Sequence, residues 1–407
     1  MNILLSAYAC EPNKGSEPGV GWSWAIELAK HHSVWVLTRD NNESTINKYL
    51  QENPTYKNTN LHFVYVGLSP NLTFWKKGRR GMRLFYMMWQ YKATKVAQEL
   101  HKNINFDLVQ HVTFVSYTQP SYMYKLGIPM IWGPISGGEN IPNVIKLKMS
   151  IREKSIEFFR KLSQKFALIL PSIRMTMKKS EYIFVATEET KDKIPIKYRN
   201  KVKVISAIGL EFIPKLNNKN KNKSHKVKII MAGRLIYWKA FDIGIKAYLN
   251  IVEKYPNTEL HILGQGDKKN SLEVLAGRYL NKNIFFQNPI SHDEIFDFYY
   301  QYDIFMNTSL RDSGCMTMME ALSVGLPCVT ISCGGPKKMA NKYMKVEPDE
   351  NEIVINNLAN KLEILIDNIN NSSVIEQYKI DIESLTMKSK INNIKTIYNE
   401  LYSIKNR

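Results

Sequence analysis

The chain has 407 residues, enough for two domains of roughly 200 residues each, and 44% of them are hydrophobic, as in folded globular proteins. Its four cysteines form no Cys-x-x-Cys pair, and no apolar run reaches the roughly 18 residues that span a bilayer, which argues against a disulfide-rich secreted protein and an integral membrane protein. The formal net charge of +19 indicates an anionic partner, which could be a membrane, a nucleic acid or a phosphorylated acceptor.

The opening of the chain predicts a strand, a loop, a helix and a second strand, which are Asn2–Ala7, Cys10–Gly21, Trp22–His31 and Val34–Thr38. In a doubly wound sheet this loop would lie at the edge where ligands bind. Gly19 and Gly21 would then let the backbone approach a ligand closely. The glycines do not follow the Gly-x-Gly-x-x-Gly spacing with an acid at the next strand end, so we do not expect a nicotinamide cofactor.

A histidine ends one of the strands predicted in the rest of the first half. These strands are Leu61–Val66, Phe106–His111, Met130–Trp132, Tyr182–Ala186 and Val202–Ile205, and an amphipathic helix is predicted over Met82–Leu100. A single histidine is more often structural than catalytic. His111 is nevertheless a candidate catalytic residue, because strand ends converge on the ligand-binding edge of a parallel sheet.

A polar run, Asn217–Lys228, predicts a solvated linker, and a second series of strands and Gly-rich turns follows it. The strand Val227–Met231 leads to Gly233, Arg234 and Lys239. Two cations at a strand end could clamp a diphosphate leaving group, since arginine offers a planar fork and lysine a point charge. The next strand, Leu260–Leu263, ends in a turn that contains Gly264 and Gly266, and Ser291–Glu294 predicts a capping box.

The most informative stretch is Asn307–Lys338, which predicts strand, turn, helix, strand and turn in succession. Asp312-Ser313-Gly314 forms the first turn, and Gly334-Gly335-Pro336 the second. The amides near Ser313–Thr317 would point out of the helix N-terminus, which suits a diphosphate. Asp312 could accept hydrogen bonds from sugar hydroxyls, and Glu320, eight positions later, could do so from a ribose diol.

This arrangement of an acid, seven residues, Glu-Ala, Gly-x-Pro, an apolar strand and Gly-Gly resembles the donor-site signature of family 4 retaining glycosyltransferases. Many members have glutamate where this chain has Asp312. The segment GSEPGVGW is similar to the family's first loop, which faces the sugar and the phosphates of the donor. A histidine that many relatives carry near Gly133–Ser136 is missing here.

The resemblance implies an α/β protein of the GT-B type, with two Rossmann-like domains facing each other across a cleft. We expect an N-terminal, acceptor-side domain over 1–210, a polar linker over 211–226, a donor domain over 227–385 and a C-terminal helix over 386–407 that packs back on the first domain. It also implies that Ile290 lies against the nucleotide base. The expected catalytic residues are Arg234, Lys239, Asp312 and His111, and the expected donor-binding residues are Gly19, Gly21, Gly233, Gly264, Gly266, Ile290, Ser313, Gly314, Cys315, Met316, Thr317 and Glu320.

The implied reaction is transfer of a sugar, with retention, from a nucleotide diphosphate sugar to an acceptor hydroxyl. The acceptor would be a saccharide or a lipid-linked saccharide of surface polysaccharide synthesis. No cofactor and no metal are expected, since no Asp-x-Asp or His/Cys cluster stands out. The alternatives are a sugar-nucleotide epimerase of the same fold and a nucleotide-sugar binding protein without activity. A nucleic-acid binder would explain the charge but not the Gly-rich strand ends, so no nucleic acid is expected.

Two segments carry most of the positive charge. Residues 75–95 contain seven basic and no acidic side chains, and residues 143–180 contain ten basic and two acidic ones. In the second segment Ile156, Phe159, Leu162, Phe166 and Ile169 recur at helical spacing. Such a helix could be a core helix with a solvated basic side, or it could dock the protein on anionic lipid. We therefore expect a cytoplasmic protein, or one peripheral on the inner face of the membrane.

Overall fold

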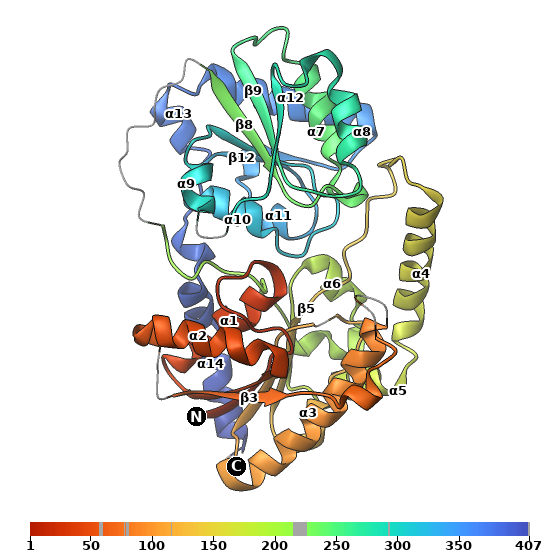
Figure 1. Ribbon diagram of the computed structural model, residues 1–407, viewed down its shortest axis with the longest axis vertical. Helices are drawn as coiled ribbons and strands as arrows, with labels where there is room; N and C mark the ends of the chain where they lie inside the picture. The colour runs from red at the N-terminus through yellow and green to blue at the C-terminus, as the bar shows by residue number, and fades with distance from the viewer. Residues whose placement is uncertain are drawn as a thin grey trace. The chain divides into compact units, whose positions relative to one another are not determined.

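The structure is a computed structural model that describes residues 1–56, 60–76, 78, 81–114, 116–214, 226–291 and 294–405. These residues form two compact units, each built around one parallel sheet with helices on its faces (Figure 1). The first unit comprises Met1–Gly138, Lys161–Glu211 and Met387–Arg407, and the second comprises Glu139–Arg160 and Phe212–Thr386. The predicted α/β fold of two Rossmann-like units is confirmed. Most of the predicted linker lies outside the described residues.

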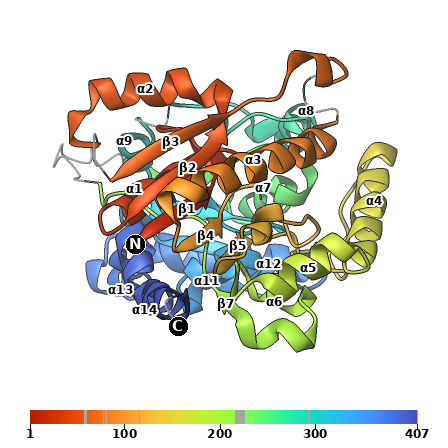
Figure 2. The ribbon, with the colours of Figure 1, turned by 90° about the horizontal axis from the view of Figure 1, so that it is seen from below.

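The first sheet has the strand order β3-β2-β1-β4-β5-β6-β7 in the described chain, which can be followed in Figure 2. The strands are β1 (Asn2–Ser6), β2 (Ser33–Arg39), β3 (Leu61–Val66), β4 (Leu108–His111), β5 (Met130–Ile135), β6 (Tyr182–Val185) and β7 (Val202–Val204). The helices of this unit are α1 (Ser16–Ala29), α2 (Glu43–Glu52), α3 (Met82–Ile104), α5 (Pro171–Lys179), α6 (Glu188–Lys193) and α14 (Met387–Lys405). Most of the central strands are buried along their whole length, which explains why they are continuous apolar runs.

The second sheet has the order β10-β9-β8-β11-β12-β13 in the described chain. Its strands are β8 (Val227–Ala232), β9 (Thr258–Leu263), β10 (Ile284–Gln287), β11 (Ile304–Asn307), β12 (Cys328–Ile331) and β13 (Lys345–Val346). Its helices are α7 (Phe241–Leu249), α8 (Lys269–Ala276), α9 (Ile295–Tyr299), α10 (Met316–Ser323), α11 (Gly334–Met339), α12 (Asn351–Asp367) and α13 (Ser372–Glu376). Helix α4 (Ile151–Ala167) carries the chain from the second unit back to the first.

The structure changes the predicted first domain in one important respect. Residues 139–160 belong to the second unit, although the sequence placed them in the first. Ile145 is buried in the core of the second unit, and Ile141 and Leu147 pack against that core. Asn351 of α12 adds two hydrogen bonds to the backbone of Lys146, at 2.9 and 2.8 Å. These contacts explain why the segment leaves the first unit.

Helix α14 covers one face of the first sheet. Its apolar side chains are buried together with β1 and α1, and they are Met387, Ile391, Ile394, Tyr398 and Leu401. The hydroxyl of Tyr398 also donates to Gln110 on β4 at 2.6 Å. Helix α14 begins at Met387, one residue after the predicted start of the C-terminal helix.

Three other predicted features differ in the structure. The first helix begins at Ser16 instead of Trp22, so Gly19 and Gly21 lie inside α1. The predicted turn Gly334-Gly335-Pro336 is the first turn of α11. The basic segment 143–180 contains two helices, α4 and α5. Within the described chain, no helix combines the length and apolar character that crossing a membrane requires.

Candidate active site

The second sheet places the predicted donor residues at its topological switch point. Strands β8 and β11 are neighbours, and the chain runs from β8 toward one edge of the sheet and from β11 toward the other. Such a point leaves a crevice at the carboxyl ends of the strands, where ligands bind in open α/β sheets. The loop after β8 carries Gly233, Arg234 and Lys239, and the loop after β11 carries Asp312. The structure thus brings together two segments more than seventy positions apart.

Lys239 and Asp312 form an ion pair at this point. The ammonium Nζ donates to Asp312 Oδ2, and the two side chains are only 14% and 18% exposed. Burial tends to lower the pKa of Lys239, but the Asp312 carboxylate outweighs it and the pKa is raised. Burial tends to raise the pKa of Asp312, but Lys239 and two backbone amides hold it below its ordinary value. Both groups are therefore charged near neutral pH.

The second oxygen of Asp312 organises the turn before α10. Oδ1 accepts the amide N–H of Gly314 at 3.1 Å and that of Cys315 at 2.9 Å. Two of the amides predicted to face a diphosphate are therefore bonded to Asp312. Asp312 shapes the loop and holds Lys239, and both of its oxygens have protein partners. These contacts do not favour the predicted role of Asp312 as an acceptor of hydrogen bonds from sugar hydroxyls.

Glycines in the loops after β9 and β12 lie against the backbones of neighbouring loops. An added Cβ at Gly264 would lie 1.9 Å from the carbonyl oxygen of Gly233, and one at Gly266 would lie 2.3 Å from that of Leu235. Gly334 approaches the Asp312 carbonyl in the same way, at 2.1 Å. These glycines are needed for contact between loops. The predicted donor-binding role of Gly233, Gly264 and Gly266 therefore stays a prediction.

Hydrogen bonds join the two central loops directly. The amide of Leu310 donates to the carbonyl of Trp238 at 2.9 Å, and the Thr308 hydroxyl donates to the carbonyl of Lys239 at 2.9 Å. The Thr317 hydroxyl of α10 reaches the Ala232 carbonyl at the end of β8, at 3.2 Å. The position of Lys239 is thus fixed by backbone as well as by Asp312.

The other predicted donor residues differ in exposure. Arg234 is exposed, Ser313, Met316 and Thr317 are partly buried, and Ile290 packs against the core between β8 and α10. Cys315 is only 5% exposed, and burial raises the pKa of its thiol to about 11. This cysteine is therefore unlike a reactive thiol, and we expect slow alkylation.

Glu320 lies on α10 with only 5% of its surface exposed. Burial raises the pKa of its carboxyl group from 4.5 to about 7. A carboxyl group in this state can accept or donate a hydrogen bond near neutral pH. Glu320 can therefore form a hydrogen bond with a hydroxyl group placed beside it.

We expect Glu320→Gln to change the pH dependence of stability. Since the folded pKa lies above the unfolded one, the wild-type protein loses stability as pH rises through about 7, by at most roughly 3 kcal/mol. The glutamine variant lacks this loss, so its unfolding temperature should rise relative to the wild type between acidic and mildly alkaline pH. Parallel pH profiles for the two proteins would contradict the burial argument.

The predicted residues of the first unit do not form a comparable group. His111 ends β4 but is 1% exposed, and its Nε2 lies 2.6 Å from the Tyr86 hydroxyl. Burial lowers the pKa of this histidine to about 4. An added Cβ at Gly19 or Gly21 would meet the carbonyl oxygens of Lys14 and Ala9, at 2.0 and 2.1 Å. These glycines thus pack α1 against its own preceding loop, and the geometry of His111 gives a catalytic role no support.

Three residues that were not predicted from the sequence hold the loops after β8 and β11 together. Glu157 of α4 is buried and accepts hydrogen bonds from Tyr237, in the β8 loop, and from Arg311, in the β11 loop. The guanidinium of Arg311 also lies over the Trp238 ring, 4.4 Å from its centroid. A signal was present in the sequence: the only acids of the basic segment 143–180 are four positions apart, which puts them on one helix face.

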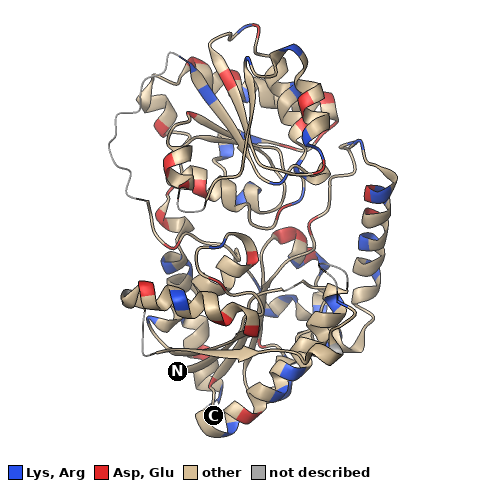
Figure 3. Ribbon diagram, in the orientation of Figure 1, with Lys and Arg blue, Asp and Glu red and all other residues tan. Residues whose placement is uncertain are grey.

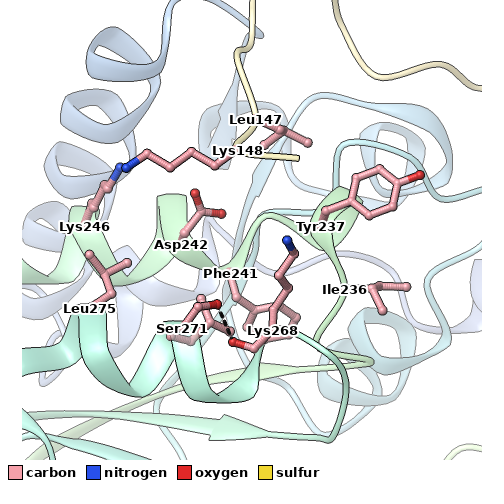
Figure 4. A pocket seen from close by; sticks show the side chains of 11 residues that line it. Leu147, Lys148, Ile236, Tyr237, Phe241, Asp242, Lys246, Lys268, Ser271 and Leu275 are labelled. Atoms are coloured by element: carbon pink, nitrogen blue, oxygen red, sulfur yellow. Dashed lines mark hydrogen bonds between the residues drawn. The ribbon is translucent and has the colours of Figure 1, made fainter. Parts of the chain in front are cut away.

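A cavity of about 290 Å³ adjoins these loops and shares Tyr237 with them. Figure 4 shows three lysines around it, Lys148, Lys246 and Lys268, together with the carboxylate of Asp242. Neither Lys239 nor Asp312 lines this cavity. No group of three or more His, Cys, Asp or Glu residues able to hold a metal ion occurs in the described ranges.

The two parallel sheets and the loop arrangement of the second one define an α/β protein of the GT-B type. Residues 212–379 match the family described as glycosyl transferases group 1. The match contains Arg234, Lys239, Asp312 and Glu320. The resemblance predicted from the sequence is thereby confirmed for the second unit.

Curated relatives are similar over part of their length. An uncharacterized glycosyltransferase of Methanocaldococcus jannaschii is 28% identical over 49% of this chain and 51% of its own length. The alpha-monoglucosyldiacylglycerol synthase of Acholeplasma laidlawii is 25% identical over 62% of this chain and 64% of its own. The chain thus spans about half to two thirds of these relatives.

One solved structure illustrates the likeness of the whole fold. HepE of Anabaena, solved in complex with UDP-glucose, superposes with a TM-score of 0.62 at 14% identity and covers 99% of both chains. At this level of identity the likeness concerns the fold alone. It extends over both units, beyond the segment that the family covers.

Proposed function

We propose that this protein is a glycosyltransferase that moves a sugar from a nucleotide diphosphate sugar to an acceptor hydroxyl. The observation that carries the proposal is the buried Lys239 ammonium, fixed at the switch point of the second sheet inside the segment that matches glycosyl transferases group 1. The complex of HepE with UDP-glucose supports a donor of this class.

In this proposal Lys239 meets the charge that builds on the leaving diphosphate. Arg234, in the same loop, and the N-terminus of α10 supply further positive charge near the diphosphate. Asp312 holds Lys239 in place and shapes the turn. Glu320 accepts a hydrogen bond from the ribose, and Ile290 lies against the base.

We further propose retention at the transferred sugar carbon and a mechanism in which these cations offset the phosphate charge without a metal ion. Both points rest on the resemblance of Asn307–Lys338 to family 4 enzymes. A lipid-linked saccharide is the proposed acceptor, and the name of the Acholeplasma synthase agrees with a lipid acceptor.

A panel of nucleotide diphosphate sugars tests the proposal. We expect release of nucleotide from one donor, accelerated by a lipid-linked or free saccharide, and a product with the donor's anomeric configuration by NMR. Conversion of one sugar nucleotide into another without nucleotide release would identify an epimerase instead. Saturable binding with no turnover would identify a binding protein, and in both cases the transferase proposal would fail.

A further inference from the structure

Helix α4 turns its polar side inward. Glu153, Glu157, Arg160 and Gln164 follow one another at spacings of four, three and four, which places them on one face. Each bonds within the protein: Glu153 to Lys268 at 3.0 Å, Glu157 to Tyr237 and Arg311, Arg160 to Asn140 at 2.6 Å and Gln164 to the Gly137 carbonyl at 2.7 Å. Polar contacts therefore attach this helix to the rest of the chain.

The apolar side of α4 faces solvent instead. Phe158, Phe159 and Phe166 are 63%, 65% and 50% exposed, and Ile156 and Leu162 of the same helix are exposed as well. The apolar surface continues through Ile169 and Leu170 to Met175 of α5, all of them exposed. The interpretation as a core helix was therefore wrong. Exposed apolar side chains grouped in this way mark an interaction surface.

Basic side chains lie among these apolar ones. Lys161 and Lys165 of α4 and Arg174, Lys178 and Lys179 of α5 are exposed, and residues 158–180 include no acidic side chain. Figure 3 shows the basic residues of α4 in blue. Two copies of this surface would bring like charges together, so a second copy of the chain is a poor partner for it. An anionic apolar partner suits both of its features.

We propose that this α4–α5 face, made of Phe158, Phe159, Leu162, Phe166, Ile169, Lys161, Lys165, Arg174 and Lys178, docks the protein on an anionic phospholipid bilayer. The apolar side chains would enter the boundary between headgroups and acyl chains, and the lysines and Arg174 would meet lipid phosphates. Arg160 is not part of this face, because it is bonded to Asn140 and the Glu139 carbonyl. The inference does not depend on the proposed transfer reaction.

Flotation with phosphatidylglycerol–phosphatidylcholine vesicles tests the apolar contribution. The wild-type protein should float with these vesicles at low salt and stay behind with phosphatidylcholine alone. Replacing Phe158, Phe159 and Phe166 together by serine should weaken binding at least roughly tenfold. The control exchanges Val274 and Ile196, each 81% exposed and outside the face, for serine and should leave binding unchanged. Equal losses in both variants would overturn the assignment to this face.

Charge is tested by a matched pair of double variants. Lys161→Gln with Lys165→Gln should weaken binding to anionic vesicles at least roughly tenfold, since each basic residue near an anionic surface contributes about fivefold. Lys203→Gln with Lys282→Gln removes the same charge at exposed positions elsewhere and should have a smaller effect. If the two pairs weaken binding equally, net charge and not this face attracts the protein.

A local probe shows where the protein touches the bilayer. The native cysteines Cys10, Cys315, Cys328 and Cys333 are buried, so Phe159→Cys should accept a polarity-sensitive dye selectively. Its emission should shift to the blue on phosphatidylglycerol vesicles, whereas a dye at Val274→Cys should not respond. A blue shift that depends on protein concentration without lipid, with a doubled mass in light scattering, would identify a dimer interface and overturn docking. A wild-type protein that fails to float would also overturn it, even if transfer were demonstrated.

Discussion

Replacing Lys239 with methionine is expected to slow sugar transfer strongly and to destabilise the second unit. The variant leaves Asp312 ionised and buried without its partner, which should cost about 3–5 kcal/mol of unfolding free energy. If Lys239 faces the leaving diphosphate as proposed, loss of this cation should lower turnover by roughly a hundredfold to a thousandfold. Denaturant titration measures the first effect, and turnover at saturating donor measures the second.

The double variant Lys239→Met, Asp312→Asn separates the two effects. It removes both charges, so it should regain much of the stability that Lys239→Met loses but none of the turnover. The pKa directions add a second check. Because the pKa of Asp312 is lowered in the folded state, its ionised carboxylate stabilises the wild-type protein at pH values above its ordinary pKa. This stabilisation is lost at acid pH, so the difference in stability between the wild type and Lys239→Met should become small there. Wild-type turnover in Lys239→Met would refute its role at the diphosphate.

Replacing Gly264 with alanine is expected to separate the loops that follow β8 and β9. Gly264 has φ near 151°, and its added Cβ would lie 1.9 Å from the Gly233 carbonyl oxygen, so both backbone strain and a clash result. The loss of unfolding free energy should be at least about 3 kcal/mol. Donor affinity should fall as well, since Gly233 precedes Arg234 in the displaced loop. Calorimetry with the nucleotide donor and thermal unfolding measure these effects.

Gly127→Ala is a control for a glycine that has a positive φ but no close neighbour. Gly127 also has a positive φ, 74°, but an added Cβ there would meet nothing within 4 Å. Its substitution should cost only about 1 kcal/mol. If Gly264→Ala costs no more than this control, the contact between the two loops contributes little to the donor site.

The strands of both sheets could be predicted closely because burial on two faces leaves a continuous apolar run. The predicted strand Asn2–Ala7 ends one residue beyond β1, and the predicted strand Val227–Met231 ends one residue before β8 does. Helix α1 was harder, since Gly19 and Gly21 resemble loop residues by composition alone. Their reason for being glycine lies in the carbonyls of Lys14 and Ala9, which no local pattern reveals.

The placement of Lys239 and Asp312 at one edge of a sheet could be predicted, but the contact between them could not. The strand-end positions of Lys239 and Asp312 pointed to the same edge of a sheet, whereas their ion pair depends on which strands are neighbours. Helix α4 shows a second limit. Its sequence shows the amphipathic period, but it does not show which side of the helix faces the protein. The polar partners of that side, such as Lys268 and Arg311, lie far away in the sequence.

The path of the chain between the units has a consequence for biosynthesis. Every piece of the second unit lies between residues 139 and 386, whereas the first unit needs Met387–Lys405 to cover the face that α14 buries. On the ribosome, the sheet that is synthesised first is therefore the one completed last. The nascent N-terminal half exposes the apolar surface that α14 later covers while residues 212–386 are translated. A chaperone that shields this surface would suit such a delay.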